Sequence, residues 1–166
     1  QILPIEPIEK AIPQLAMSLC VSQHLEAAKA IMTTDTFPKE YAVTFEIDGK
    51  TCCMGGMAKG SGMIHPNMAT TLNFITTDCS ITTEMLQKAL SEIVKITYNC
   101  LSIDGDTSTN DMVCLMSSGV CENKEITEEG EDFETFKKAL YQVMANLTRM
   151  LAKDGEGASK LLTCIC

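Results

Sequence analysis

Apolar residues near the beginning of the chain follow a mixed helical pattern. Pro13 removes a backbone donor, so it is expected to start or break a helix. The segment from Pro7 to Lys29 therefore predicts two short helices rather than one. Their apolar positions are Ile8, Ile12, Leu15, Met17, Leu19 and Leu25.

The next pattern is that of a β-hairpin. Residues 41–47 alternate large apolar side chains with smaller or polar ones, which is the period of a strand. The pair Asp48-Gly49 accepts positive φ angles and so provides a turn. We therefore expect a second strand, from Thr51 to about Ala58, to pair back on the first.

A glycine-rich stretch follows and leads into a third strand. Residues 55–71 read GGMAKGSGMIHPNMATT, with glycines on both sides of Lys59. Glycine at this density lets the backbone turn sharply or approach another group closely, although it costs chain entropy on folding. The third strand begins near Met68, and its alternation puts Thr70 on the same face as Phe74.

Two amphipathic helices are predicted in the second half of the chain. The first has Thr82 or Thr83 as its cap and an apolar stripe over residues 85–94. The second runs from about residue 133 to residue 150, and Asp154-Gly155 ends it.

Two further strands complete the pattern. Residues 112–116 form an apolar strand after the polar segment 106–111, and residues 161–166 have the composition of a buried strand. This mixture of strands and helices favours an α/β protein, an α+β layered sandwich with helices covering its sheets. Because both ends of the chain look like interior positions, we expect residues 1–166 to be the central part of a longer precursor.

The composition narrows the classes of function. An apolar content of 45% supports a folded core, and a formal charge of -9 argues against nucleic-acid binding, which needs clustered Lys and Arg. No apolar run approaches the length of about 20 residues that crosses a bilayer. We therefore expect no nucleic-acid partner, no membrane partner, and a location in the cytoplasm, or in the mitochondrial matrix of a eukaryote.

The nine cysteines raise the question of disulfides or a metal. Their odd number and the large apolar chain disfavour a disulfide scaffold, so we expect most of them to be buried small hydrophobes. Zinc sites show paired C-x2-C spacing, which neither Cys52-Cys53 nor the pair Cys164 and Cys166 has. Only His24 and His65 could add ligands, so the sequence predicts no metal site.

Two loop motifs match known sites only in part. The lysine of Lys59-Gly60-Ser61-Gly62 precedes the glycines and the chain continues into a strand, so this stretch is not a P-loop. A calcium loop starting at Asp104 would need Gly and Glu where the chain has Thr109 and Leu115. A hydrogen-bonded turn is the better interpretation of residues 104–108.

A hydroxyl nucleophile without a histidine base is the remaining catalytic option. Neither of the two histidines lies in a recognisable nucleophile setting. After cleavage of the preceding peptide bond, the α-amine of an N-terminal threonine can act as the base, because its pKa of about 8 leaves part of it unprotonated. Thr70 fits this chemistry, although its setting also suits an ordinary β-branched strand residue.

Four separated blocks then point to one family. They are AIMTTDT at 30–36, KGSGMIHPNMAT at 59–70 with FITTD at 74–78, DGDTSTND at 104–111 and DGEGA at 154–158. Together they closely resemble the ornithine acetyltransferases, the glutamate N-acetyltransferases of arginine biosynthesis. The resemblance implies the self-processing, Ntn-like fold of that family, incomplete in this chain.

The resemblance also implies a mechanism. The precursor would cleave itself between Ala69 and Thr70, so that residues 1–69 end an α chain and residues 70–166 start a β chain. The Thr70 hydroxyl would take the acetyl group from N-acetylornithine and pass it to glutamate, without a metal or an organic cofactor. Acetyl-CoA as a second donor stays open, and the α and β chains would assemble as a heterotetramer.

Three further residues match substrate-binding positions of the family. Lys59 can pair with a substrate carboxylate, Glu156 with an amino group, and Thr33 can hydrogen-bond either. Each also has a structural explanation, as a solvated loop charge, a helix-end side chain and a turn former respectively.

Two departures from the family pattern matter. Its Thr-Gly oxyanion pair would precede Gln1 and further substrate contacts would follow Cys166, so we expect the chain alone to be inactive. Position 71 is Thr where Met is common, and Ala69 before Thr70 favours Thr70 as the nucleophile. A related self-cleaving aminopeptidase or amidase and a non-catalytic module are the alternatives.

Overall fold

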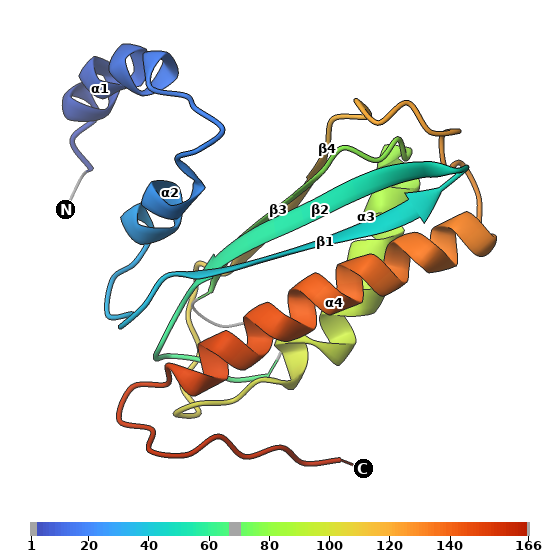
Figure 1. Cartoon of the computed structure of the whole chain (residues 1–166). Helices are drawn as coiled ribbons and strands as arrows, with labels where there is room; N and C mark the ends of the chain where they lie inside the picture. Colours follow the sequence, from blue (N-terminus) through green and yellow to red (C-terminus); the bar gives the residue numbers. More distant parts are fainter. Residues whose placement is uncertain (1–2, 67–70, 166) are drawn as a thin grey trace.

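The computed structural model describes residues 3–66 and 71–165 (Figure 1). One long helix packs against a four-stranded sheet. A second, shorter helix packs against that long helix. The strands are β1 (Lys39–Ile47), β2 (Lys50–Lys59), β3 (Leu72–Thr77) and β4 (Met112–Ser117), and the helices are α3 (Thr83–Ile93) and α4 (Glu131–Lys153). The 3-10 helices η1 (Val94–Ile96) and η2 (Tyr98–Cys100) follow α3. This layered arrangement confirms the predicted α/β class.

The strands stand in the order β1-β2-β3-β4, with β3 and β4 parallel and the other pairs antiparallel. The hairpin between β1 and β2 turns at Asp48 and Gly49, whose φ angles are 54° and 70°. Positive φ at both residues is typical of a type I′ turn. The predicted hairpin and its turn are therefore confirmed.

One end of the sheet gathers the predicted catalytic blocks. Lys59, the last residue of β2, pairs with Leu72 of β3, and Leu72 also pairs with Met112 of β4. The predicted third strand is thus present from Leu72 onward. Its expected beginning, residues 67–70, lies outside the described part of the chain.

Both predicted helices of the second half are confirmed. The Thr82 hydroxyl accepts a hydrogen bond from the Met85 N–H and caps α3, and α4 ends immediately before Asp154. Within residues 3–66 and 71–165, no helix combines the length and the apolar content that crossing a membrane requires.

Close packing of α4 on the sheet depends on a glycine in β2. A Cβ added to Gly56 would lie 3.0 Å from Ile75 Cγ1 and 3.2 Å from both Leu147 Cδ1 and Val143 Cγ1. The missing side chain therefore lets the helix approach the strands. The opposite face of the sheet carries an apolar groove of about 540 Å³ whose lining includes Ala42, Met57, Phe74 and Met116.

The N-terminal segment forms the two predicted helices, α1 (Glu6–Met17) and α2 (His24–Ala30). The expectation for Pro13 is wrong, because Pro13 lies inside α1. All of α1 is exposed, so water can hydrogen-bond the carbonyl group that the proline leaves without a donor. His24 Nδ1 lies 2.9 Å from Glu40 Oε2 and joins α2 to β1.

The predicted strand at residues 161–166 is wrong for the described part. Residues 161–165 have no regular structure, and Leu162 is 85% exposed. Beyond α4 the chain runs past the helix ends and away from the sheet (Figure 1). Its backbone therefore has no neighbouring strand among the described residues with which to form ladder hydrogen bonds, whatever its apolar composition.

Candidate active site

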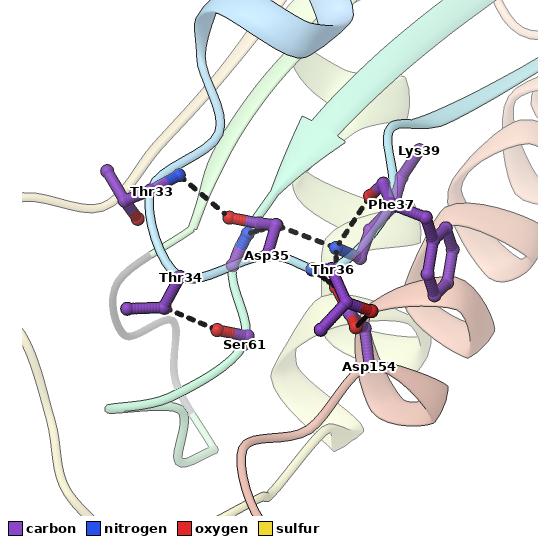
Figure 2. A network of polar contacts seen from close by, with 9 residues as sticks. Thr33, Thr34, Asp35, Thr36, Phe37, Lys39, Ser61 and Asp154 are labelled. Carbon is purple, nitrogen blue, oxygen red and sulfur yellow. Dashed lines mark hydrogen bonds and ion pairs between the residues drawn. The ribbon is translucent and has the colours of Figure 1, made fainter.

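A buried lysine joins segments that are far apart in the sequence (Figure 2). Lys39 is fully buried at the start of β1, and its Nζ lies 2.6 Å from Asp35 Oδ1 and 2.6 Å from Asp154 Oδ2. Buried charges are tolerated when they are paired and hydrogen-bonded. The ion pairs therefore fix the loop before β1 to the end of α4.

Backbone N–H groups and a hydroxyl also donate hydrogen bonds to the carboxylates of Asp35 and Asp154. Asp35 accepts hydrogen bonds from the Gly60 N–H at 2.7 Å and from the Thr33 N–H at 3.2 Å. Asp154 accepts one from the Thr36 N–H at 2.9 Å and another from the Thr36 hydroxyl. The loop after β2 thus joins the same network.

These contacts set the charge of the network. Burial alone would raise the pKa of both carboxyls. Hydrogen bonds from the Gly60 N–H and the Lys39 ammonium outweigh burial at Asp35 and lower its pKa. Lys39 and Thr36 do the same for the pKa of Asp154. Both carboxyls are therefore ionised at neutral pH.

The loop after β2 also contacts the segment after α4. The Ser61 carbonyl accepts a hydrogen bond from the Glu156 N–H at 2.6 Å, and the hydroxyls of Ser61 and Thr34 lie 2.5 Å apart. A Cβ built on Gly62 would lie 2.9 Å from Glu156 Oε2. The Glu156 carboxylate therefore occupies the space that a side chain at position 62 would take.

Residues 104–108 form the predicted hydrogen-bonded turn. Asp104 Oδ1 accepts from the Asp106 N–H at 3.2 Å, and the same carboxylate accepts from the N–H groups of Met63 at 2.6 Å and Ile64 at 3.0 Å. Burial would raise the pKa of Asp104, but these backbone donors lower it. The turn therefore holds the glycine-rich loop in place.

Asp111 holds the start of β3. Its Oδ1 accepts a hydrogen bond from the N–H of Thr71, which is 3% exposed, and the Thr71 carbonyl accepts one from the Met112 N–H at 3.0 Å. Burial raises the pKa of Asp111, although the Thr71 N–H and the charge of Lys59 act in the opposite direction. Lys59 and Asp111 therefore belong to one electrostatic environment beside the start of β3.

The contacts bring together the segments that carry three of the predicted site residues. Thr33 precedes Asp35 by two positions, Lys59 precedes Gly60, and Glu156 follows Asp154 by two positions. Thr33 and Glu156 are exposed, and Lys59 is half-buried. The predicted nucleophile Thr70 and its neighbour Ala69 lie outside the described residues.

Sequence reasoning gave no role to the residues that hold this site together. Asp35, Asp111 and Asp154 lie inside the four family blocks, which were the available signal for them. Lys39 lies outside every block. Because its partner Asp154 is 115 positions away, no local pattern reveals the pair.

The expectation that most cysteines are buried is wrong. Of the eight described, Cys52 and Cys79 are buried, and Cys114 and Cys121 are half-buried. The exposed ones are Cys20, Cys53, Cys100 and Cys164. Cys53 lies on the open face of β2, whereas the others belong to connecting segments or short helices at the surface, where burial is not available.

Known proteins support the resemblance. The family model of the ArgJ family matches residues 1–166. The arginine biosynthesis bifunctional protein ArgJ of Caldanaerobacter subterraneus subsp. tengcongensis is 51% identical over 160 residues, which are 96% of this chain and 40% of that protein. The protein of the same name from Geobacillus stearothermophilus is 48% identical over 96% of this chain and 39% of its own length.

A solved structure agrees with these relatives. The crystal structure of arginine biosynthesis bifunctional protein argJ from Bacillus halodurans is 49% identical, with a TM-score of 0.50 over 52% of this chain and 41% of that chain. The chain thus spans about 40% of the length of the curated relatives it matches. Since the family model matches every residue and relatives are about half identical over 96% of the chain, the chain belongs to the ArgJ family, the ornithine acetyltransferases that its four sequence blocks indicated.

Proposed function

We propose that the whole protein transfers an acetyl group from N-acetylornithine to glutamate through an acetyl-threonine intermediate on Thr70. The Thr70 hydroxyl attacks the acetyl carbonyl, the bond to the ornithine nitrogen breaks, and ornithine leaves with the proton. The amine of glutamate then attacks the ester and regenerates the hydroxyl. The free α-amine of Thr70, produced by cleavage after Ala69, serves as the base.

The convergence of three segments is the observation that best supports this proposal. The network around Lys39 ties the backbone of Thr33 to Gly60, the neighbour of Lys59, and to the end of α4, two residues before Glu156. In the proposed site Lys59 binds a substrate carboxylate, Glu156 an amino group, and Thr33 donates or accepts a hydrogen bond. These groups suit the two ends of an amino acid.

Cleavage after Ala69 would leave residues 1–69 at the end of an α chain and residues 70–166 at the start of a β chain. The two chains would remain associated, because strand β2 of the α chain pairs with β3 of the β chain. The ion pair between Lys39 and Asp154 adds a second link across the cut. Further association of such αβ pairs into a heterotetramer is part of the same proposal.

Two alternatives predict different products. A related aminopeptidase or amidase would hydrolyse the acyl-enzyme, so that acetate appears without N-acetylglutamate. A non-catalytic module would neither cleave itself nor transfer acetyl groups.

The test uses a precursor that spans the length of the relatives. Intact-mass measurement should find two pieces that meet at Ala69-Thr70, and the protein should convert N-acetylornithine and glutamate to ornithine and N-acetylglutamate. Thr70→Ala should abolish both results, whereas Thr71→Ser should keep both because Thr71 precedes β3 as a backbone anchor and is not the nucleophile. The assignment of Thr70 as the nucleophile would be wrong if Thr70→Ala still cleaved itself, or if Thr71→Ser failed to cleave itself while Thr70→Ala did.

A further inference from the structure

Sulfur atoms and a carboxylate gather at the end of the sheet where the β1–β2 hairpin turns. Cys52 lies near the start of β2, Asp78 and Cys79 directly follow β3, and Cys121 lies in the loop after β4. Cys52 Sγ and Cys121 Sγ are 3.3 Å apart. A carboxylate oxygen of Asp78 lies within 4.8 Å of both sulfurs. Strand β2 and the segments that follow β3 and β4 therefore contribute to one cluster of metal-ligating atoms.

The cluster is held by the surrounding backbone. Asp78 Oδ1 accepts a hydrogen bond from the Cys53 N–H at 2.7 Å, and the Asp78 carbonyl accepts one from the Cys121 N–H at 2.9 Å. Asn123 Oδ1 accepts from the Ser80 N–H at 2.7 Å and closes the loop over Cys52. The donor atoms are thus presented by segments that are already fixed to one another.

The spacing suits a small thiophilic cation. A tetrahedral zinc ion with Zn–S bonds of about 2.3 Å needs its two sulfurs about 3.8 Å apart, so the observed pair must open by about half an ångström. Cys79 lies beside Cys52, but its sulfur is not within 4.8 Å of every other ligand atom, so it would have to move to supply the fourth ligand. Two thiolates, a carboxylate and a further sulfur or water make up the four ligands that zinc prefers.

A route from solvent exists. Asp78 lines a groove of about 410 Å³ together with Cys53, Ser117 and Ser118. Cys121 is half-buried, whereas Cys52 is fully buried. An ion can therefore reach the Asp78 carboxylate from this groove, and the buried Cys52 closes the inner side.

We propose that Cys52, Cys121 and Asp78 form a binding site for one thiophilic divalent cation of the Zn²⁺ type, with Cys79 or a water molecule as the fourth ligand. Binding replaces the S–H bond of each ligating cysteine with a metal–sulfur bond and releases one proton per thiol to solvent, two when water is the fourth ligand and three when Cys79 is. The ion would tie β2 to the loops that follow β3 and β4. Because Lys59 lies seven positions after Cys52 along β2, about 23 Å at the usual strand rise, this site is distinct from the candidate active site.

The test is a titration of the reduced protein with Cd²⁺, a spectroscopic stand-in for Zn²⁺. We expect one Cd²⁺ per chain by native mass spectrometry, a cadmium–thiolate charge-transfer absorption band, and loss of that band on addition of Zn²⁺. Cys52→Ser and Cys121→Ser should each weaken binding by more than about 100-fold, and Asp78→Asn by about 10- to 100-fold. Cys100→Ser, which removes an exposed thiol outside the cluster, should bind as the parent does.

Two results would overturn the proposal. One is the absence of stoichiometric Cd²⁺ binding, or equal binding by the parent and by Cys121→Ser. Cys121 is the better position for this comparison, because it is half-buried and its replacement disturbs folding less than replacement of Cys52 does. The other is a folded Cys52→Ser variant that keeps the full cadmium–thiolate band of the parent. Circular dichroism checks that each variant is folded.

Discussion

Asp111 and Thr71 are joined by a hydrogen bond of 2.5 Å between the carboxylate Oδ1 and the backbone N–H. That N–H belongs to the peptide group that links Thr71 to Thr70, the proposed nucleophile. The backbone next to the nucleophile is therefore anchored to a segment 40 residues further along the chain. A charge-assisted hydrogen bond of this kind fixes direction as well as position.

Removing the Asp111 carboxylate should therefore slow self-cleavage. In a precursor of the relatives' length, Asp111→Ala should lower the cleavage rate by about 10- to 100-fold, since one charged hydrogen bond is worth about 1.5–3 kcal/mol. Asp111→Asn keeps an oxygen acceptor and should lose less. The measurement is the fraction of uncut precursor over time by intact mass. Equal rates for Asp111→Ala and the parent would show that this contact does not position the cleavage site.

Lys39 should contribute strongly to the free energy of unfolding at neutral pH. Lys39→Met leaves Asp35 and Asp154 buried without their cation, which typically costs about 3–5 kcal/mol. Urea unfolding at pH 7 measures this loss. The control is Lys88→Met, which removes an exposed ion pair to Glu129 and should change stability by less than about 1 kcal/mol.

The pH dependence of the same variant gives a second prediction. The pKa values of Asp35 and Asp154 are lowered in the folded protein, so these groups stabilise it above their unfolded pKa of about 4. That stabilisation is lost as the pH falls through their folded pKa values. In Lys39→Met the carboxyls protonate more readily, so the stability difference from the parent should shrink as the pH is lowered from 7 towards 4. A difference independent of pH would contradict the ion-pair explanation.

Local signals explain which parts of the fold could be predicted. Asp48-Gly49 specifies its turn through φ angles that few residues accept, and Thr82 caps α3 through a neighbouring backbone group. Both depend on residues within four positions of each other. The strand expected at residues 161–166 failed because a strand also needs a partner, and apolar composition says nothing about where that partner lies.

The candidate site was predictable only in its parts. Family blocks indicated Thr33, Lys59 and Glu156 as candidates. The segments of Thr33 and Glu156 are joined by Lys39, whose two carboxylate partners lie 4 and 115 positions away. Periodicity shows which face of a strand is buried. It does not show which charged side chain from a distant part of the chain lies against that face. Likewise the spacing of Cys52, Asp78 and Cys121 in the sequence hid their proximity, because zinc signatures describe ligands within one loop.

Gly62 should control the position of Glu156 and not the stability of the fold. A Cβ at position 62 would lie 2.9 Å from Glu156 Oε2, the free end of a flexible side chain that can move away. Gly62→Ala should therefore leave the melting temperature nearly unchanged and raise KM for the amino-acid substrate by about 3- to 10-fold, the loss of about one hydrogen bond. Gly130→Ala, where a Cβ meets nothing within 4 Å, should leave KM unaltered. A large drop in stability with unchanged KM would contradict a role in placing Glu156.

Gly55 and Gly56 are neighbours in β2 that face opposite sides of the sheet, and their replacement by alanine should affect stability differently. A Cβ on Gly56 meets Ile75, Leu147 and Val143 at 3.0–3.2 Å, so the helix or the strand must move, which typically costs about 1–3 kcal/mol. A Cβ on Gly55 meets Ala42 Cβ at 3.5 Å, an ordinary contact.

Gly55→Ala should therefore be neutral, or stabilise by up to about 1 kcal/mol, because alanine reduces the entropy of the unfolded chain. Urea unfolding of both variants tests the pair under one set of conditions. Equal effects of the two substitutions would mean that α4 can adjust to a methyl group beneath it, and close packing would then not explain the glycine at position 56. A selective loss in Gly56→Ala would show that the distance between α4 and the sheet is fixed, and with it the position of Asp154 at the end of α4.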